Sequence, residues 1–317
     1  MTERRCLLCY ESLGDKDSEM HPACARRLFG SPEAPRVDCT RDDITRLALQ
    51  VVLARITVPG VQAKLSLGLS HGTAPRTPDR LTLVDTPGGY ILKPPGNAYP
   101  YLPELEDLCM HLAGDARIAT VPHGLVRLAS GELAYLTKRI DRDGQRMVHM
   151  EDMCQLSGKP TEAKYRGSHE QVARLILRHS AAPLLDVIAF YERVLFCFFT
   201  GNSDMHLKNF SLIKDVVRGT VLSPAYDLVA TSLVLEEDPE ELALTLNGKK
   251  RKLQRADFEA AMRGAGMEEK VIANLFMRIA RSLPRWEQRI ERSFVPRELG
   301  ERLRSLVRGR LARLGMG

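Results

Sequence analysis

A short polar segment in the second half of the chain carries the residue types that phosphoryl transfer requires. It runs Phe199-Thr-Gly-Asn-Ser-Asp-Met-His-Leu-Lys-Asn-Phe210 and places Asp204, His206, Lys208 and Asn209 close together between two apolar runs. Phosphoryl transfer needs a carboxylate that orients and deprotonates the acceptor hydroxyl, a cation near the transferred phosphate, and oxygen ligands for Mg²⁺. The segment supplies all three, so we predict a catalytic loop here, with a hydrogen-bonded structural turn as the alternative.

A second acidic residue downstream fits the same chemistry. Asp204 and Asn209 have the Asp-x-x-x-x-Asn spacing that protein kinases use in their catalytic loop. Mg²⁺ prefers hard oxygen ligands, so a carboxylate is expected to join the Asn209 amide on the metal. Asp227, in Ser223-Pro-Ala-Tyr-Asp-Leu228, stands where a kinase has its metal-binding Asp-Phe-Gly. We therefore predict Asn209 and Asp227 as magnesium ligands and Asp204 as the catalytic base.

A lysine and a glutamate upstream complete the set in the order found in kinases. Lys93 ends the β-like run Tyr90-Ile-Leu-Lys93, as does the strand lysine that neutralises the α- and β-phosphates of ATP. Glu106 on the following helix could pair with it. Taken singly, a lysine at a strand end and a glutamate on a helix are ordinary surface residues, so the order and spacing of the whole set carry the prediction.

The candidate phosphate-binding loop has an unusual composition. Val58-Pro-Gly-Val-Gln-Ala-Lys64 contains one glycine instead of the three of a kinase glycine-rich loop. Because backbone amides alone would surround the phosphates poorly, Gln62 and Lys64 are expected to add side-chain donors. An ordinary turn before an alternating run is the alternative.

Two kinds of scaffold must position these residues, and the hydrophobic pattern predicts both. Between residues 56 and 140, short β-like runs lie at 64–69, 81–84, 90–93 and 133–140. One helix interrupts them, with Pro103 as its expected first residue and Leu105, Leu108 and Leu112 at the helical spacing that buries one face. After about residue 141 the pattern turns helical, at 170–180, at 184–199, and from about residue 255 to the end. The predicted fold is α+β and protein-kinase-like, with a small β-rich lobe and a larger helical lobe. The expected divisions are a Cys-rich head over 1–39, an N-lobe over 40–142 and a helical C-lobe over 143–317.

Composition excludes several classes of protein. With 317 residues, 44% apolar and 27% charged, the chain is neither disordered nor fibrous. It has no run of eighteen apolar residues and no secretory signal pattern, so we expect a soluble, cytoplasmic protein without a membrane partner. The formal net charge is +6, and the positive charge is concentrated after Lys249, where a solvated helix face is the simplest reading.

The first 39 residues contain four of the seven cysteines. Cys6, Cys9, His21 and Cys24 have the spacing C-x2-C-x11-H-x2-C, which suits tetrahedral Zn²⁺ bound by three thiolates and one imidazole. A segment this small needs such a link to fold. Buried packing of unmetallated cysteines and a redox role are the alternatives.

The residues described above resemble the HipA family of bacterial toxin serine/threonine kinases, and its short, HipT-like members most closely. The resemblance covers about residues 55 to 230 in the family's order. The matching stretches are Gly60-Val-Gln-Ala-Lys-Leu65, Ile91-Leu-Lys93, Leu102-Pro-Glu-Leu-Glu106 running to Met110-His-Leu-Ala113, Lys138-Arg-Ile-Asp-Arg142, Glu151-Asp-Met-Cys-Gln155 with Lys164-Tyr165, Gly201-Asn-Ser-Asp-Met-His-Leu-Lys-Asn209 and Pro224-Ala-Tyr-Asp-Leu228.

The resemblance implies a kinase-like fold, Mg-ATP as cofactor, and specific roles for the residues above. It places Asp204 as the catalytic base, His206 and Lys208 near the transferred group, and Asn209 and Asp227 on the metal. It implies a structural ion pair between Lys93 and Glu106, with Lys93 on the phosphates. The implied ATP contacts are Gly60, Val61, Gln62, Lys64, Lys93, Lys138, Arg139, Ile140 and His206, of which 138–140 would form the adenine-side hinge.

The resemblance also implies a biological context. Members phosphorylate aminoacyl-tRNA synthetases, which halts translation, and a helix-turn-helix antitoxin that represses the operon neutralises them. They autophosphorylate in the ATP loop, where Thr57 occupies the hydroxyl position; short members tend to carry Ser-x-Ser there, whereas this chain reads Thr57-Val-Pro59. Only about 55 residues precede that loop, too few for the N-terminal β subdomain of longer members, so we expect a separate small subunit to supply it.

Two other functions remain open on sequence alone. A small-molecule kinase of the aminoglycoside or choline type also uses Asp-x-x-x-x-Asn with a downstream Asp, but usually has His two residues before the catalytic Asp, where this chain has Asn202. A non-catalytic ATP-binding partner of a repressor would suit the glycine-poor loop and the basic C-terminal third.

Overall fold

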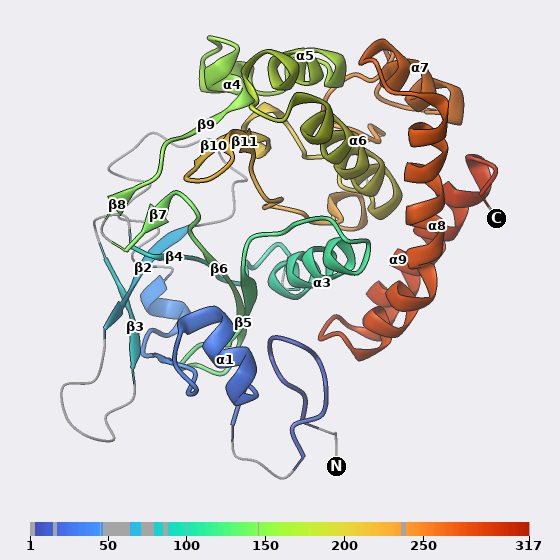
Figure 1. The fold of residues 1–317 in the computed structure, drawn as a ribbon. Helices are drawn as coiled ribbons and strands as arrows, with labels where there is room; N and C mark the ends of the chain where they lie inside the picture. The colour runs from blue at the N-terminus through green and yellow to red at the C-terminus, as the bar shows by residue number, and fades with distance from the viewer. Residues whose placement is uncertain are drawn as a thin grey trace. The chain divides into compact units, whose positions relative to one another are not determined.

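The chain forms two compact units, which we describe separately. The computed structural model describes residues 4–14, 18–44, 46, 64–70, 79–84, 88–99, 101–144, 146–235 and 239–316. Unit 1 consists of Met1–Asp107, Val121–Gly144 and Arg292–Phe294, and unit 2 consists of Leu108–Thr120, Gln145–Glu291 and Val295–Gly317 (Figure 1). The domain boundaries predicted at residues 39 and 142 stay predictions.

Unit 1 contains a six-stranded sheet within its described residues. The strand order is β1-β3-β2-β4-β6-β5, and all neighbours are antiparallel except β1 and β3. Strands β2, β3, β4 and β6 confirm the β-like runs predicted at 64–69, 81–84, 90–93 and 133–140, and the sheet adds β1 and β5, which were not predicted. The strands are β1 (Arg36–Val37), β2 (Leu65–Ser70), β3 (Arg80–Leu83), β4 (Tyr90–Lys93), β5 (His123–Arg127) and β6 (Leu133–Lys138), and the short β7 (Arg142–Asp143) follows them.

The Cys-bearing N-terminal segment shares one hydrophobic core with this sheet. Helix α1 (Pro22–Phe29) begins with a proline and ends at Gly30, whose φ of 82° suits glycine. Leu8 and Leu28 lie so close to β5 that a Cβ on Gly124 would be 3.3 Å and 3.4 Å from them. The core therefore joins residues far apart in the sequence, namely Cys6, Leu7, Leu8, Leu28, Leu67, Leu92, Leu125 and Leu136 among others.

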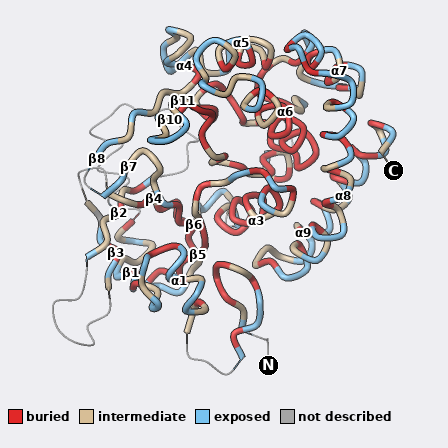
Figure 2. The backbone as a smooth tube through the Cα atoms, in the orientation of Figure 1, coloured by how far each residue is buried: buried red, intermediate tan, exposed pale blue. Residues whose placement is uncertain are grey.

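Helix α3 (Leu102–Asp115) is the helix that the sequence predicted between the strands, and it begins one residue before Pro103. Leu105, Leu108 and Leu112 are completely buried, which confirms the apolar face inferred from their spacing. Figure 2 shows this burial along the helix. The helix also carries Glu106, so its packing positions that carboxylate.

Unit 2 is mainly helical, as predicted. Helices α5 and α9 both pack on α6 (Figure 1). The described elements are β8 (Arg146–Met147), β9 (Met150–Asp152), α4 (Met153–Leu156), η1 (Thr161–Ala163), α5 (His169–His179), α6 (Pro183–Thr200), η2 (Leu207–Asn209), β10 (Ser211–Asp215), β11 (Gly219–Leu222), η3 (Thr231–Leu233), α7 (Arg255–Gly264), α8 (Glu269–Arg292) and α9 (Arg297–Arg313). Strands β11, β10 and β9 form an antiparallel sheet.

The buried helix α6 leads directly into the polar segment singled out above. All residues from Phe190 to Thr200 are buried. The helix carries its own aromatic and aliphatic side chains on every face, which is typical of a helix packed inside a protein. Gly201 ends it with φ 77°, and a Cβ there would lie 2.2 Å from Ser232 Oγ. Only glycine fits this position, so the predicted break after residue 199 has a steric cause.

Among the described residues, no helix has the length and apolar character needed to cross a membrane.

Candidate active site

Residues 201–209 form the predicted catalytic loop between α6 and β10. The Asn202 amide donates to Cys197 O (2.8 Å), which ties the start of the loop to α6. The Ser203 amide donates to Thr231 Oγ1 (2.8 Å), and the two hydroxyls lie 3.0 Å apart. The backbone of the loop is therefore held by α6 on one side and by η3 on the other, so its polar side chains are presented from a fixed support.

Asp204 and Asn209 meet within this loop. Asn209 Nδ2 donates to the backbone oxygen of Asp204 (3.1 Å), and Asn209 is buried. This bond uses the amide nitrogen, so the amide oxygen is the atom left to act as a ligand. The Tyr165 hydroxyl donates to Asp204 Oδ1 (2.6 Å) and orients the carboxylate. The Asp-x-x-x-x-Asn spacing thus produces the proximity that the chemistry requires.

His206 is buried in the same loop with an unsatisfied ring nitrogen. Its exposed fraction is 6%, its ring packs edge-on against Tyr165, and its Nδ1 has no hydrogen-bond partner among the described residues. Burial lowers the pKa of His206 to about 4; the Asp204 and Asp227 charges oppose this shift and the Lys164 ammonium adds to it. The imidazole is therefore neutral at pH 7. A buried polar atom without a partner is costly, and a ligand is one explanation for it.

The segment that carries Asp227 lies against the catalytic loop. The Tyr226 hydroxyl donates to Lys208 O (3.1 Å) and shares a hydrogen bond of 2.5 Å with the Ser211 hydroxyl. Asp227 itself has φ 55°, in the left-handed region that few non-glycine residues adopt, and such residues cluster at functional sites. The negative charge of Asp227 opposes the lowering of the His206 pKa, so the two side chains are near each other. The structure therefore brings the two predicted metal ligands and the predicted base into one region of unit 2.

Arg193 of α6 supports the start of that segment. It is 2% exposed, and its Nη2 donates to Ser223 O (2.8 Å), four residues before Asp227. Burial lowers the pKa of Arg193 to about 10, which still leaves it charged at pH 7. Helix α6 therefore positions both the catalytic loop and the Asp227 segment.

Lys208 makes an ion pair at the edge of the loop. Its Nζ lies 2.8 Å from Asp152 Oδ2, and Asp152 is also the N-cap of α4. The Asp152 carboxylate accepts the Gln155 amide hydrogen, and Gln155 Oε1 accepts from the Asp152 amide, which makes a capping box. Lys208 is thus held toward α4, and its predicted place near the transferred phosphate stays a prediction.

Sequence reasoning missed the partners that orient these groups. Tyr165 and Asp152 occur in the stretches that carry the family resemblance, but no spacing rule assigns them a role. Tyr165 lies 39 residues before Asp204 along the chain, and Asp152 lies 56 residues before Lys208. Contacts over such separations depend on tertiary packing, so the only signal in the sequence was their membership of those stretches.

The predicted ion pair of unit 1 is present. Lys93 Nζ at the end of β4 lies 2.5 Å from Glu106 Oε1 on α3, and the two side chains are 4% and 2% exposed. The Lys93 ammonium also lies 5.4 Å from the centre of the Tyr135 ring. A fully buried pair needs close contact and further partners to offset desolvation, so this geometry indicates that the position of Lys93 matters.

The predicted hinge follows the last residue of β6. The Lys138 amide donates to Pro122 O (2.8 Å), and the Arg139 amide donates to Gly89 O (2.9 Å). The Arg139 guanidinium makes two hydrogen bonds to Asp141, and Ile140 is half-buried. The adenine contacts assigned to 138–140 stay predictions.

Most of the candidate phosphate-binding loop lies outside the described residues. This holds for Thr57, Gly60, Val61 and Gln62, while Lys64 is described, exposed and directly precedes β2. Their predicted roles stay predictions.

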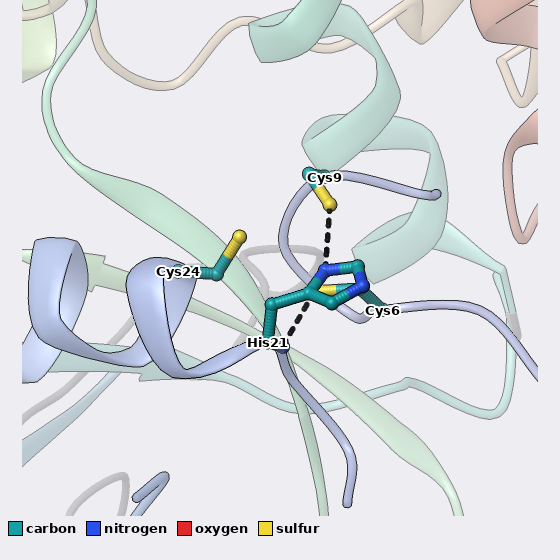
Figure 3. A group of neighbouring side chains, drawn as sticks. All are labelled: Cys6, Cys9, His21 and Cys24. Atoms are coloured by element: carbon teal, nitrogen blue, oxygen red, sulfur yellow. Dashed lines mark hydrogen bonds between the residues drawn. The ribbon is translucent and has the colours of Figure 1, made fainter. Parts of the chain in front are cut away.

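The four predicted metal ligands of the N-terminal segment do come together. One ligand atom each from Cys6, Cys9, His21 and Cys24 lies within 4.8 Å of all the others (Figure 3). Burial, followed by the charges of Cys6 and Cys9, raises the pKa of the Cys24 thiol to about 12. Three thiols packed this closely cannot all ionise without a cation among them.

Comparison with known proteins identifies the family of the chain. The family model for the HipA-like C-terminal domain matches residues 56–286. The chain belongs to this family. Among curated proteins, this HipA-like chain is 28% identical to a Haemophilus influenzae protein named "Putative kinase", over 82% of each chain. Two Sinorhizobium fredii proteins named as putative kinases are 33% and 31% identical over 59% and 65% of this chain, which spans about half of their length.

Two solved structures show the fold. HipA of Shewanella oneidensis MR-1, solved with HipB and operator DNA, superimposes with a TM-score of 0.68 at 22% identity, over 81% of this chain and 65% of that one. The Helicobacter pylori kinase CtkA superimposes with a TM-score of 0.55 at 14% identity, over 79% of this chain and 93% of that one. The predicted family and the α+β, protein-kinase-like fold of this HipA-like chain are therefore confirmed.

Proposed function

We propose that this protein is an ATP-dependent kinase that transfers the γ-phosphate of ATP to a hydroxyl group. The observation that carries the proposal is the meeting of Asp204, Asn209 and the Asp227 segment around His206, whose buried Nδ1 lacks a partner among the described residues. The proposed metal ligands are the Asp227 carboxylate and the Asn209 amide oxygen, which are ligands that Mg²⁺ prefers. A site of this composition fits a magnesium nucleotide.

Each side chain has a role in this proposal. Asn209 and Asp227 hold the metal, and Lys93, fixed by Glu106, pairs with the phosphates. Mg-ATP, when bound, supplies the electrophilic phosphorus and neutralises the charge on the phosphate oxygens. Asp204 takes the proton of the acceptor hydroxyl at Oδ2, because Tyr165 occupies Oδ1. His206 stays neutral, so its Nδ1 can accept a hydrogen bond in the site.

The acceptor we propose is a serine or threonine of a protein. The family resemblance favours a component of translation such as an aminoacyl-tRNA synthetase, and the three curated relatives named as putative kinases support phosphotransfer in general. Autophosphorylation at Thr57 belongs to the same proposal, as do ATP contacts through Gly60, Val61, Gln62 and Lys64.

The partners we propose are those of a toxin-antitoxin system. The Shewanella HipA was solved with HipB and operator DNA, which supports a helix-turn-helix antitoxin that contacts DNA. A separate small subunit that replaces the N-terminal β subdomain of longer members is the second proposed partner. Purification of the native operon products tests both, and full neutralisation by one helix-turn-helix protein alone would remove the second.

The experiment that tests the catalytic proposal follows the γ-phosphate of radiolabelled ATP. Wild-type protein, Asp204→Asn and the control Glu162→Gln are incubated with a bacterial extract that contains both proteins and metabolites. Glu162 is an exposed carboxylate in η1, near the Lys164-Tyr165 stretch, and contacts none of the proposed site residues in the described structure. Label is expected in protein for the wild type and the control, and at least about 1,000-fold less for Asp204→Asn, since the chemical step loses its base.

Each alternative gives a different result in this experiment. Label in a small metabolite would indicate a small-molecule kinase instead. No label in any fraction, together with growth arrest unchanged by Asp204→Asn, would indicate a non-catalytic nucleotide-binding protein. Either result would end the proposal of a protein kinase.

A further inference from the structure

The N-terminal segment contains a compact group of soft ligand atoms that the proposed phosphotransfer does not use. Cys6 and Cys9 lie in a tight turn, closed by the Tyr10 amide donating to Cys6 O (3.0 Å). His21 is the N-cap of α1, and Cys24 lies in its first turn. Figure 3 shows the side chains from these two places pointing toward one another. All four belong to unit 1 and are described.

The spacing of the ligand atoms suits a tetrahedral Zn²⁺ ion. Zinc binds thiolate sulfur at about 2.3 Å and imidazole nitrogen at about 2.0–2.1 Å, so neighbouring ligand atoms in a tetrahedron lie roughly 3.5–3.8 Å apart. Cys9 Sγ lies 3.3 Å from His21 Nδ1, and no pair within the group exceeds 4.8 Å. Small side-chain rotations would therefore complete the coordination without any change in the backbone.

The hydrogen bonds of His21 select the tautomer that a metal needs. Its Nε2 lies 3.0 Å from Ser12 O, a carbonyl that can only accept, so Nε2 carries the proton. The lone pair is then on Nδ1, the nitrogen that faces Cys9 Sγ (Figure 3). Metal-bound histidines characteristically donate their second ring N–H to a carbonyl in this way.

A backbone amide is placed to stabilise a thiolate at Cys6. The His21 amide donates to Cys6 Sγ (3.4 Å). An amide that donates to a ligand sulfur is a supporting contact expected of a metal site.

The ligand types of the group indicate which metal ion it would bind. Cys6, Cys9 and Cys24 form no disulfide in the structure, so no disulfide explains the clustering. The set holds three sulfurs, one imidazole and no carboxylate, which favours zinc over magnesium or calcium. All four protein ligands are present, so no position is left open for a substrate or water, and the site is of the structural kind.

We propose that Cys6, Cys9, His21 and Cys24 bind one structural Zn²⁺ ion that anchors the N-terminal segment to the sheet of unit 1. The turn that this ion would fix also contacts helix α3 through Tyr10. Tyr10, which follows the Cys6–Cys9 turn with φ 67°, donates from its hydroxyl to Asp107 Oδ2 (2.6 Å). Asp107 is completely buried beside Glu106 on α3, and His123 Nδ1 of β5 lies 2.6 Å from its other oxygen. The metal thus fixes a turn whose tyrosine holds α3.

Metal analysis of the full-length protein tests this proposal. Wild type, Cys9→Ser and the control Cys39→Ser are purified without a metal-affinity tag, and their zinc content is measured. Cys39 is half-buried and packs against the same core, but it is not part of the group. We expect about one zinc ion per chain in wild type and Cys39→Ser, and loss of most of it in Cys9→Ser, because a four-ligand site loses most of its affinity with one ligand.

A second measurement uses the wild type alone, in case Cys9→Ser does not fold. A strong chelator is expected to remove the zinc, lower the melting temperature and expose three additional thiols to a thiol reagent, and added Zn²⁺ is expected to reverse all three changes. Replacement by Co²⁺ is expected to give the visible absorption of a tetrahedral thiolate site. Wild type that is purified without stoichiometric zinc, with an unchanged melting temperature after added zinc or chelator, would overturn the proposal.

Discussion

The Tyr165 hydroxyl donates a 2.6 Å hydrogen bond to Oδ1 of Asp204, across 39 residues of sequence. The same ring packs edge-on against His206, at 5.0 Å between ring centres. One tyrosine therefore touches both the proposed base and the buried imidazole beside it. This makes Tyr165 the positioning residue of the site, since it acts on the reacting hydroxyl only through Asp204.

Replacement of Tyr165 tests this relationship. Tyr165→Phe keeps the ring against His206 and removes only the hydrogen bond to the carboxylate. Because Tyr165 is partly exposed and water can replace it, we expect kcat to fall by about tenfold, equivalent to about 1.4 kcal/mol, with the KM for ATP unchanged. Steady-state kinetics measure the split between kcat and KM. An equal change in KM and none in kcat would mean that Tyr165 contacts the nucleotide rather than orients Asp204.

The buried ion pair of unit 1 gives a prediction about stability. Lys93→Met leaves the Glu106 carboxylate buried without its cation, so we expect the free energy of unfolding of unit 1 to fall by about 3–5 kcal/mol. In the double variant Lys93→Met/Glu106→Leu most of that stability should return, because two apolar side chains fill the site. Both variants should lack phosphotransfer activity, because neither has Lys93. Hydrogen exchange of the β4 and α3 amides measures the stability of this unit.

An exposed ion pair of the same unit serves as the control. Arg127 pairs with Glu19 at 3.0 Å, but the two side chains are 43% and 41% exposed. Arg127→Met is therefore expected to cost less than about 1 kcal/mol. If Lys93→Met and Arg127→Met destabilise equally, the buried pair has no special structural role.

Two buried histidines of unit 2 each contribute a loss of stability in mild acid, while Glu192, whose pKa burial raises to about 7, contributes in the opposite direction. Burial lowers the pKa of both His169 and His206 to about 4, against 6.5 for the free side chain. Between these values the two imidazoles bind protons in the unfolded chain but not in the folded chain, so their contribution to stability falls as the pH drops from about 6.5 toward 4. Each imidazole should contribute about 2 kcal/mol of loss between pH 7 and pH 5.

Urea unfolding at pH 7 and pH 5, followed by the fluorescence of Trp286 in unit 2, measures this loss. His169→Asn keeps a donor for Thr245 O but cannot titrate, so it should reduce the loss of stability between the two pH values by about 2 kcal/mol. His179→Asn, at an exposed position of α5, should leave the difference unchanged. The same difference in all three proteins would show that other groups cause the acid sensitivity.

The features of the fold that could be predicted from the sequence are those that depend on residues close together in the chain. The β-like alternation of β2, the helical spacing of Leu105, Leu108 and Leu112, and the break at Gly201 each follow from neighbouring residues. Strand β5 was missed because its residues are buried almost without interruption, so no alternation marks it.

In the candidate site too, contacts between residues close in sequence were predictable and contacts between distant residues were not. The proximity of Asp204 to Asn209 and the Cys6 to Cys24 group follow from short spacings, so both were accessible from sequence. The Lys93–Glu106 pair was accessible because the order of the kinase set suggested it. Other contacts join residues that only tertiary packing brings together, and no periodicity in the sequence predicts them. They are Tyr165–Asp204, Lys208–Asp152 and Tyr10–Asp107.

The affinity for ATP with and without Mg²⁺ tests the central claim most directly. Calorimetric titrations compare wild type, Asn209→Ala, Asp227→Asn and the control Glu162→Gln. We predict that Mg²⁺ raises the affinity of wild type and control by at least about tenfold, or about 1.4 kcal/mol, and that either ligand variant reduces this gain to less than about twofold. If both ligand variants keep the full gain from Mg²⁺, then Asn209 and Asp227 do not hold the metal and the proposed active site is wrong.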